Sequence, residues 1–332
     1  TGERGIGKSS LINFIQPMAE GRIKNSEGGT FNFITVSVFI SKTTTLSGLI
    51  RLIEQDLSRE IGKVEKVRAF LGETWDFVKR IRVMDSGIEN GQSISDLDLL
   101  IDNFTFSLAK TCARITNPEK DELPQDGIIF FIDEADNSCN ELNIGYFFKY
   151  VSEMLVKKGC NNVMFVLAGL PDVIEKLTQS HESSLRIFSH LNVRELTPDE
   201  RRYVVDRGIS VGNEQNSEKT TITNEATNLI STLSEGYPHF IQQFAFSAFQ
   251  FNEDGEINPE DVANGAFSKG GALDEIGTRY YQSAYNEQIK SDEYREVLSI
   301  MAENMNEWIK KKDIRDKFSG ADHTVTDALK AL

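Results

Sequence analysis

The sequence predicts an α/β fold with a doubly wound parallel sheet, followed by helical domains. Three observations predict it. A glycine-rich loop runs directly into a helical pattern at 10–15. Apolar runs at 31–40, 128–132 and 162–168 have the composition of buried strands, and helical patterns separate them. After Leu196 the strand patterns stop and only helical ones follow. Alternating strands and helices are typical of a parallel sheet, and a later run of helices is typical of separate domains.

Composition excludes several classes of protein. The chain has 332 residues, enough for two or three domains, and 39% apolar with 26% charged residues argues against disorder. No stretch approaches the roughly 20 uninterrupted apolar residues of a membrane span, so we expect no membrane partner. The net charge of −15 repels nucleic acid and anionic lipid. Three widely spaced cysteines lack metal-site spacing and fit a reduced compartment, so we expect a cytoplasmic protein.

The first motif is a phosphate-binding loop. Residues 2–9 match G-x-x-x-x-G-K-[ST] at every fixed position. The glycines let consecutive N–H groups surround phosphate oxygens, and the following helix directs its positive end at them. Lys8 would contact the β- and γ-phosphates, and the Ser9 hydroxyl would bind Mg²⁺. The expected nucleotide-binding residues are Gly2, Glu3, Arg4, Gly5, Ile6, Gly7, Lys8, Ser9 and Ser10.

The second motif is an apolar run that ends in acids. Residues 128–132 predict a central strand buried on both faces, and Asp133 and Glu134 follow it directly. Carboxylates at the end of a buried strand are costly unless a ligand needs them, and ligands of open α/β sheets bind at the carboxyl ends of the strands. Asp133 would hold Mg²⁺, and Glu134 would act as the general base for an attacking water. We interpret Asp136 as a capping or solvated acid.

The other elements of the first domain follow in order. The strand that should feed the phosphate loop is absent, and we take the native N-terminus to be missing. After the strand at 31–40, Thr45 should cap a helix at 46–57. A short strand is expected at 78–83, a turn-rich segment at 85–93, and a helix at 97–115.

Beyond residue 196 the chain predicts helical domains. Thr197-Pro198-Asp199-Glu200 is a capping-box helix start. Helical patterns continue at 223–234 and 238–251, and then at 292–305, 311–318 and 324–332. The last three form a helix-turn-helix pattern with Gly320 in the turn. We therefore predict a core at 1–196, a helical lid at 197–273 and a truncated winged-helix-like domain at 274–332.

At this point the chain resembles a AAA+ ATPase. It is similar to the origin-binding initiator ATPases of replication and to related transposition and secretion ATPases. The resemblance depends on segments 2–9, 127–136, 162–196 and 235–243 and on the terminal module. It implies ATP or ADP and Mg²⁺ as ligands and assembly through the ATPase domains. The family places a polar sensor after the strand at 162–168, whereas this chain has Ala168, Gly169 and Leu170 there.

The resemblance also implies two further contacts to the nucleotide. Arg186, in a box at 183–188, is the candidate arginine finger for a neighbouring subunit, with Arg194 in reserve. A surface arginine on an amphipathic helix is an equally good interpretation. His239 occupies the place where many relatives carry a sensor arginine, although an ordinary surface or core histidine is the simpler interpretation.

The terminal module has two possible partners. Lys310, Lys311, Lys312, Arg315 and Lys317 cluster around its second helix and could contact the phosphates of double-stranded DNA. Yet residues 292–332 hold seven Lys and Arg against nine Asp and Glu, and the last helix has few base-reading side chains. A protein-binding role fits equally well.

The sequence therefore favours an ATPase switch whose nucleotide state controls assembly and engagement of DNA or protein. Lys8, Glu134 and Arg186 are the expected catalytic residues, and Ser9 and Asp133 the expected metal ligands. One alternative is a STAND-type signalling ATPase, for example in anti-phage defence, because the missing first sensor and His239 suit a slow switch. Another is a nucleotide-binding structural subunit with little hydrolysis. A motor that translocates its substrate through a ring is less favoured, because no aromatic pore-loop motif stands out in the sequence.

Overall fold

The structure, a computed structural model, describes residues 1–61, 65–78, 94–118, 123–289, 291–303 and 308–331. The chain divides into two compact units, Thr1–Arg194 and Glu195–Leu332, which are described separately. Within the described ranges, no helix combines the length and the apolar character that crossing a membrane would require.

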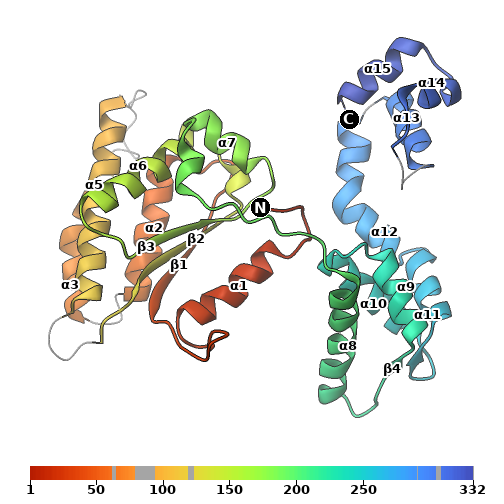
Figure 1. Ribbon diagram of the computed structural model, residues 1–332, viewed down its shortest axis with the longest axis horizontal. Coiled ribbons are helices and arrows are strands. Elements are labelled where there is room, and N and C mark those ends of the chain that lie inside the picture. Colours follow the sequence, from red (N-terminus) through yellow and green to blue (C-terminus); the bar gives the residue numbers. More distant parts are fainter. Residues whose placement is uncertain (62–64, 79–93, 119–122, 290, 304–307, 332) are drawn as a thin grey trace. The chain divides into compact units, whose positions relative to one another are not determined.

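The first unit is built on a three-stranded parallel sheet. Its strands are β1 (Phe33–Phe39), β2 (Gly127–Asp133) and β3 (Val163–Leu167), in the order β1-β2-β3 (Figure 1). Phe33 pairs with Gly127, and Ile128 pairs with Val163. Every residue of the central strand β2 is buried, which confirms the expectation of a strand covered on both faces.

Helices cover both faces of this sheet. Because successive side chains of a strand point to opposite faces, Phe130 packs into a core with α2 (Leu46–Ile61), α5 (Ile94–Thr116) and α6 (Ile144–Lys157). Its neighbour Phe131 packs on the other side, against α1 (Lys8–Ala19) (Figure 1). Among the described residues of the unit, the further elements are α3 (Glu65–Thr74), η1 (Ala135–Asn137), η2 (Asn140–Leu142), α7 (Val173–Ser180) and η3 (Ser184–Ile187).

The helix starts in this unit follow local signals. The Thr45 side-chain oxygen accepts a hydrogen bond from the Gly48 N–H at 3.1 Å, so Thr45 caps α2 as predicted. Helix α5 begins at Ile94, three residues before the predicted start. Val78 lies in a helical segment instead of the predicted strand. The rest of that strand and the whole turn-rich segment at 85–93 lie outside the described residues.

The second unit is mainly helical. Thr197 begins α8 with the predicted capping box, since its hydroxyl accepts from the Glu200 N–H and the Glu200 carboxylate accepts from the Thr197 N–H at 2.8 Å. The helices are α8 (Pro198–Gln215), α9 (Asn224–Leu233), α10 (Pro238–Phe251), α11 (Pro259–Phe267), α12 (Ala272–Ile276), α13 (Asp292–Ala302), α14 (Lys311–Lys317) and α15 (Asp322–Ala331). Two π-helical turns, η4 (Gly277–Tyr281) and η5 (Ala284–Gln288), follow α12.

One expectation for this unit is wrong, because strands do occur after Leu196. Two-residue strands β4 (Thr221–Ile222) and β5 (Glu256–Ile257) pair in parallel. Ile257 is buried in the core of α8–α12, so this short ladder anchors two loops to the helices. A separate small core holds α13, α14 and α15 together through Val297, Ile314 and Val325. The division into three domains stays a prediction.

Gly145 tests how tightly α6 packs on α7. A Cβ atom at this position would lie 2.1 Å from the Leu177 carbonyl oxygen. We expect Gly145→Ala to lower the free energy of unfolding by about 1–3 kcal/mol, because backbone atoms must move apart. Gly72→Ala is the control, since Gly72 is exposed in α3 with open space around it. It should raise stability by about 0.5–1 kcal/mol through helix propensity alone. Denaturant unfolding measures the change in the free energy of unfolding for both variants. An equal change in the two variants would refute the close contact between α6 and α7.

Candidate nucleotide-binding site

The loop at 2–9 has the backbone that its glycines allow. Gly5 and Gly7 have φ angles of 83° and 99°, in the left-handed region that favours glycine. Gly2 is required for a different reason than expected. Its φ is not in that region, but a Cβ there would lie 2.8 Å from the Val193 carbonyl oxygen. Helix α1 begins directly after Gly7, so its unpaired N–H groups lie at the end of the loop.

Lys8 lies within the loop that it is expected to serve. Its ammonium group donates hydrogen bonds to the carbonyl oxygens of Gly2 at 2.7 Å and Glu3 at 2.9 Å. Burial lowers the pKa of Lys8, and the negative charges of Asp136 and Asp133 partly offset this effect. The cation therefore lies near Asp133 at the end of β2 and near Asp136 just beyond it.

The phosphate loop and the end of β2 are joined by a direct hydrogen bond. The Ser9 hydroxyl donates to the Asp133 carboxylate over 2.7 Å, across 124 residues of sequence. Asp133 is only 8% exposed, and its second carboxylate oxygen accepts from the Glu134 N–H at 2.9 Å. The structure thus brings together the two residues that the sequence predicts as metal ligands.

Glu134 is exposed and held in an uncommon conformation. Its φ angle is 54°, which is rare for a residue other than glycine. The Asn137 side-chain amide donates to the Glu134 carboxylate at 2.8 Å and to the Ile40 carbonyl at 3.3 Å. Sequence reasoning missed Asn137, although a polar residue three positions after a strand-end acid was a usable signal.

Asp136 does not cap a helix with its side chain, so that part of the interpretation is wrong. It is half-buried, and its carboxylate accepts a hydrogen bond from the Leu170 N–H at 3.0 Å, which links the ends of β2 and β3. Gly169 allows this approach, because a Cβ there would lie 2.7 Å from the same carboxylate oxygen. Lys176 of α7, which sequence reasoning also missed, donates to the carbonyl oxygens of Asp136 and Ser138.

This arrangement fits a magnesium nucleotide. Mg²⁺ prefers oxygen ligands at about 2.1 Å in an octahedron, where adjacent ligands lie about 3 Å apart. The Ser9 hydroxyl and the Asp133 carboxylate are close enough to be adjacent ligands of that kind. The left-handed glycines leave loop N–H groups available for phosphate oxygens. The side chain of Ile6, by contrast, is buried, so Ile6 could contact a nucleotide only through its backbone.

Arg186 lies on the surface of the first unit. It belongs to the short helix η3, and its exposed guanidinium makes no hydrogen bond or ion pair with any residue that the structure describes. Arg194 is also exposed. A free, exposed guanidinium is compatible with a neighbour's site and equally with an ordinary surface residue, so the role of Arg186 stays a prediction.

His239 belongs to the second unit, in the first turn of α10. Its ring lies 5.4 Å from that of Tyr280, and its Nε2 is buried without a partner among the described residues. Burial is the main cause that lowers the pKa of His239, and the charge of Arg279 adds to it. The imidazole is therefore neutral near pH 7, which favours the simpler interpretation of a packed histidine.

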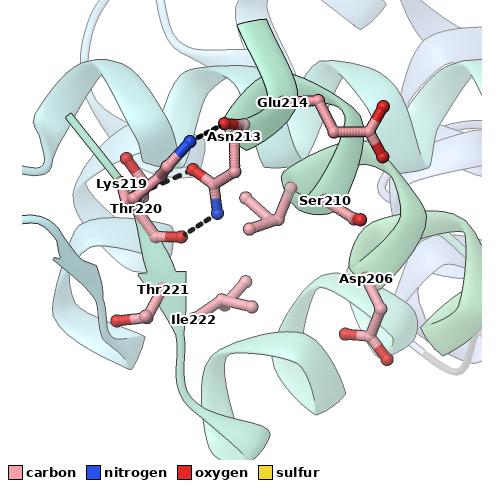
Figure 2. Close-up of a pocket in the computed structure, with 9 residues that line it drawn as sticks. Asp206, Ser210, Asn213, Glu214, Lys219, Thr220, Thr221 and Ile222 are labelled. Carbon is pink, nitrogen blue, oxygen red and sulfur yellow. Dashed lines mark hydrogen bonds between the residues drawn. The ribbon is translucent and has the colours of Figure 1, made fainter. Parts of the chain in front are cut away.

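A hollow lies beside α8 and β4 in the second unit. Its volume is about 580 Å³, and Figure 2 shows Asn213 and Lys219 at its rim. The Asn213 amide exchanges two hydrogen bonds with the backbone of Thr220, at 2.8 and 2.9 Å. Lys219 donates to backbone carbonyls of the same turn. These polar groups stabilise the turn itself, and we assign the hollow no function.

Comparison with solved structures supports the fold. The ORC2 protein of Aeropyrum pernix, solved in ADPNP–ADP complexes, has a TM-score of 0.54 and 14% identity, covering 99% of this chain and 78% of that one. Its ADP form gives a TM-score of 0.49 at 15% identity, covering 99% of this chain and 77% of that one. Cdc6p from Pyrobaculum aerophilum gives a TM-score of 0.45 at 13% identity, covering 99% of this chain and 76% of that one.

The fold assignment depends on the first of these structures, since only its TM-score exceeds 0.5. It confirms the predicted resemblance to origin-recognition-type ATPases at the level of the fold, and with it the predicted α/β fold class. No protein-family model matches the chain. No curated protein matches its sequence.

The environment of His239 predicts a pH effect on stability. Because its pKa is lower in the folded than in the unfolded chain, protonation favours unfolding. Its stabilising contribution is present above about pH 6.5, the ordinary histidine pKa, and is lost as the pH falls through the lower folded value. Denaturant unfolding at pH 7 and pH 5 should therefore show a smaller loss for His239→Gln than for the parent.

The exposed His323 provides the control. His323→Gln removes an exposed imidazole instead of a buried one. It therefore separates the effect of burying a histidine from the effect of losing one. Equal pH slopes for His239→Gln and the parent would contradict the buried, neutral state of His239.

Proposed function

We propose that this chain is an ATP-binding and ATP-hydrolysing switch of the AAA+ type. Its nucleotide state would control assembly and engagement with DNA or a protein partner. The single observation that carries the proposal is the 2.7 Å hydrogen bond between Ser9 and Asp133. It places the loop that fits phosphates beside the acids that fit a metal and a water. The fold of the ORC2 protein, which was solved with ADPNP and ADP, agrees with a nucleotide ligand.

Each residue of the site has a separate task in this proposal. The loop N–H groups and the Lys8 ammonium would hold the phosphates, while Ser9 and Asp133 would hold Mg²⁺. The bound metal would supply positive charge that neutralises the phosphate oxygens. Glu134 would accept the proton of the attacking water, and Asn137 would orient its carboxylate. Because Glu134 is exposed, water reaches it directly.

A slow signalling switch of the STAND type is the second candidate, and one observation favours it. The segment after β3, Ala168–Leu170, offers no polar side chain for the γ-phosphate. The N–H of Leu170 is already used by Asp136. A site without a first sensor would bind nucleotide well and turn it over slowly, which suits a switch that holds one state for a long time. A nucleotide-binding structural subunit with little hydrolysis is the extreme case, in which the turnover rate falls almost to zero.

Partners would contact the chain at two places. Arg186 would reach the nucleotide of a neighbouring subunit, which requires a homo- or hetero-oligomer. In the terminal module, Arg315 and Lys317 already face Asp322 and Glu303. The three lysines before them make no ion pair within the described ranges and remain available for DNA phosphates: Lys310, Lys311 and Lys312.

The assignment of Glu134 predicts a separation of binding from turnover. Glu134→Gln should retain nucleotide affinity but lower the ATPase rate about 100-fold or more, because the loop and metal ligands remain while the base is lost. Lys8→Ala should instead weaken binding at least about tenfold, since a hydrogen-bonding cation is removed from the loop. A fluorescent nucleotide titration and a phosphate-release assay measure the two effects.

Two exposed residues provide the controls, Glu141→Gln and Lys24→Ala. Both should leave affinity and rate unchanged. A Glu134→Gln protein that hydrolyses ATP at the parent rate would remove Glu134 from the mechanism. Unchanged affinity in Lys8→Ala would count against the loop as the phosphate site.

The role of Arg186 is tested by mixing two inactive variants. Arg186→Ala retains an intact nucleotide site, and Glu134→Gln retains an intact finger. In an assembly with head-to-tail contacts, random mixing pairs them productively at about a quarter of the interfaces. An equimolar mixture should therefore be more active than either variant alone. Arg194→Ala serves as the control and should be active by itself. A mixture that shows no gain would place any role of Arg186 within one subunit.

A further inference from the structure

The segment that leads into α14 carries a fully exposed tryptophan. Trp308 is 102% exposed, so its ring is as open to water as in an extended peptide. The next residue, Ile309, packs against the small core of α13, α14 and α15. Lys310 is exposed again, and its backbone is extended, with φ −75° and ψ 141°. Ile309 thus attaches the segment to the core and leaves the side chains before and after it in solvent.

The indole of Trp308 is isolated from other apolar surface. Within residues 291–303 and 308–331, it is the only large apolar side chain that is exposed. The second tryptophan of the chain, Trp75, is 3% exposed, and its Nε1 donates to the Thr111 hydroxyl at 3.0 Å. A folded protein partner or a membrane is usually met by a broader apolar patch. A single ring with both faces free suits a partner that stacks on it, as nucleobases do.

The charge beside this ring is positive although the chain is acidic. Residues 308–317 hold five Lys and Arg against two Asp, a local charge of +3 in a chain of −15. The lysines at 310–312 come first, and the two acids, Asp313 and Asp316, follow within α14. Trp308 and Lys310 are at most about 7 Å apart, because each residue spans at most about 3.6 Å. One short stretch of a nucleic acid can therefore contact the ring with a base and the lysines with its phosphates.

We propose that Trp308 and the lysines at 310–312 bind single-stranded DNA, with a base stacked on the indole. A duplex fits less well, because its bases already stack on their neighbours and an inserted ring must first unstack them. The interaction has little sequence preference, since every base has an aromatic face. The inference names the partner of the proposed function and rests on it in that respect, but it uses no residue of the nucleotide site.

A fluorescence titration of the full 332-residue chain, without nucleotide, tests the proposal. The added probe is an oligonucleotide of about 12 thymidines, within the usual site size of such proteins. Stacking should quench the emission of Trp308, whereas the buried Trp75 should not respond. With three phosphates contacted, the logarithm of the association constant should fall against the logarithm of the salt concentration with a slope of about −2. A duplex of the same length should bind at least about tenfold more weakly.

Variants separate the ring from the charge, and the anisotropy of a labelled oligonucleotide measures their affinities. Trp308→Ala should bind about tenfold more weakly, and Trp308→Phe should recover most of the affinity because a phenyl ring still stacks. Neither change should alter the melting temperature, since the side chain is exposed. Replacing the three lysines at 310–312 by glutamine should flatten the salt dependence. Lys269→Gln, at an exposed position of the second unit, is the control and should change neither quantity.

Several outcomes would overturn the proposal. They are unchanged emission on adding the oligonucleotide, tighter binding of the duplex than of the single strand, and parental affinity in Trp308→Ala. A blue shift of the emission with phosphatidylserine vesicles, without quenching by the oligonucleotide, would assign the segment to a membrane instead. A negative titration leaves the ATPase assignment standing, because the phosphate-release assay of Glu134→Gln reports on the first unit alone. Equally, an inactive ATPase would leave the titration unaffected.

Discussion

The hydrogen bond between Ser9 and Asp133 is the constraint on which the site depends. Ser9 is the second residue of α1, which packs on one face of the sheet, whereas Asp133 is the last residue of β2, the central strand. The two meet only if α1 lies against the face that carries Phe131 and if β2 is fully buried, as both are here. A polar pair at such a position is stable because each partner satisfies the other. The packing of the sheet therefore determines the geometry of the loop.

The sequence predicted what is encoded locally. The glycine spacing of the loop, the apolar run of β2 and the capping box at Thr197 each depend on fewer than about ten neighbouring residues, the range over which periodicity and capping signals act. The same local reading supplied the order of strands and helices and thus the fold class, which the likeness to the ORC2 protein confirms. The ladder of β4 and β5 was missed because two-residue strands leave no periodic signal.

The sequence could not predict contacts that depend on strand order. Asp136 reaches Leu170 because β2 and β3 are neighbours in the sheet, and nothing within ten residues of either position reveals this. Asn137 was within reach of local reasoning, but its bond to Glu134 requires the left-handed backbone at Glu134, which composition does not indicate.

The bonds of Lys176 have a mechanical consequence. Lys176 fastens α7 to the segment after Glu134, through the carbonyl oxygens of Asp136 and Ser138. At the next residue, Leu177, the backbone carbonyl accepts the buried hydroxyl of Ser184 at 2.7 Å, which ties η3 to the same helix. These hydrogen bonds connect η3, which carries Arg186, through α7 to the segment that follows Glu134. We therefore expect a displacement of η3 to be transmitted to that segment.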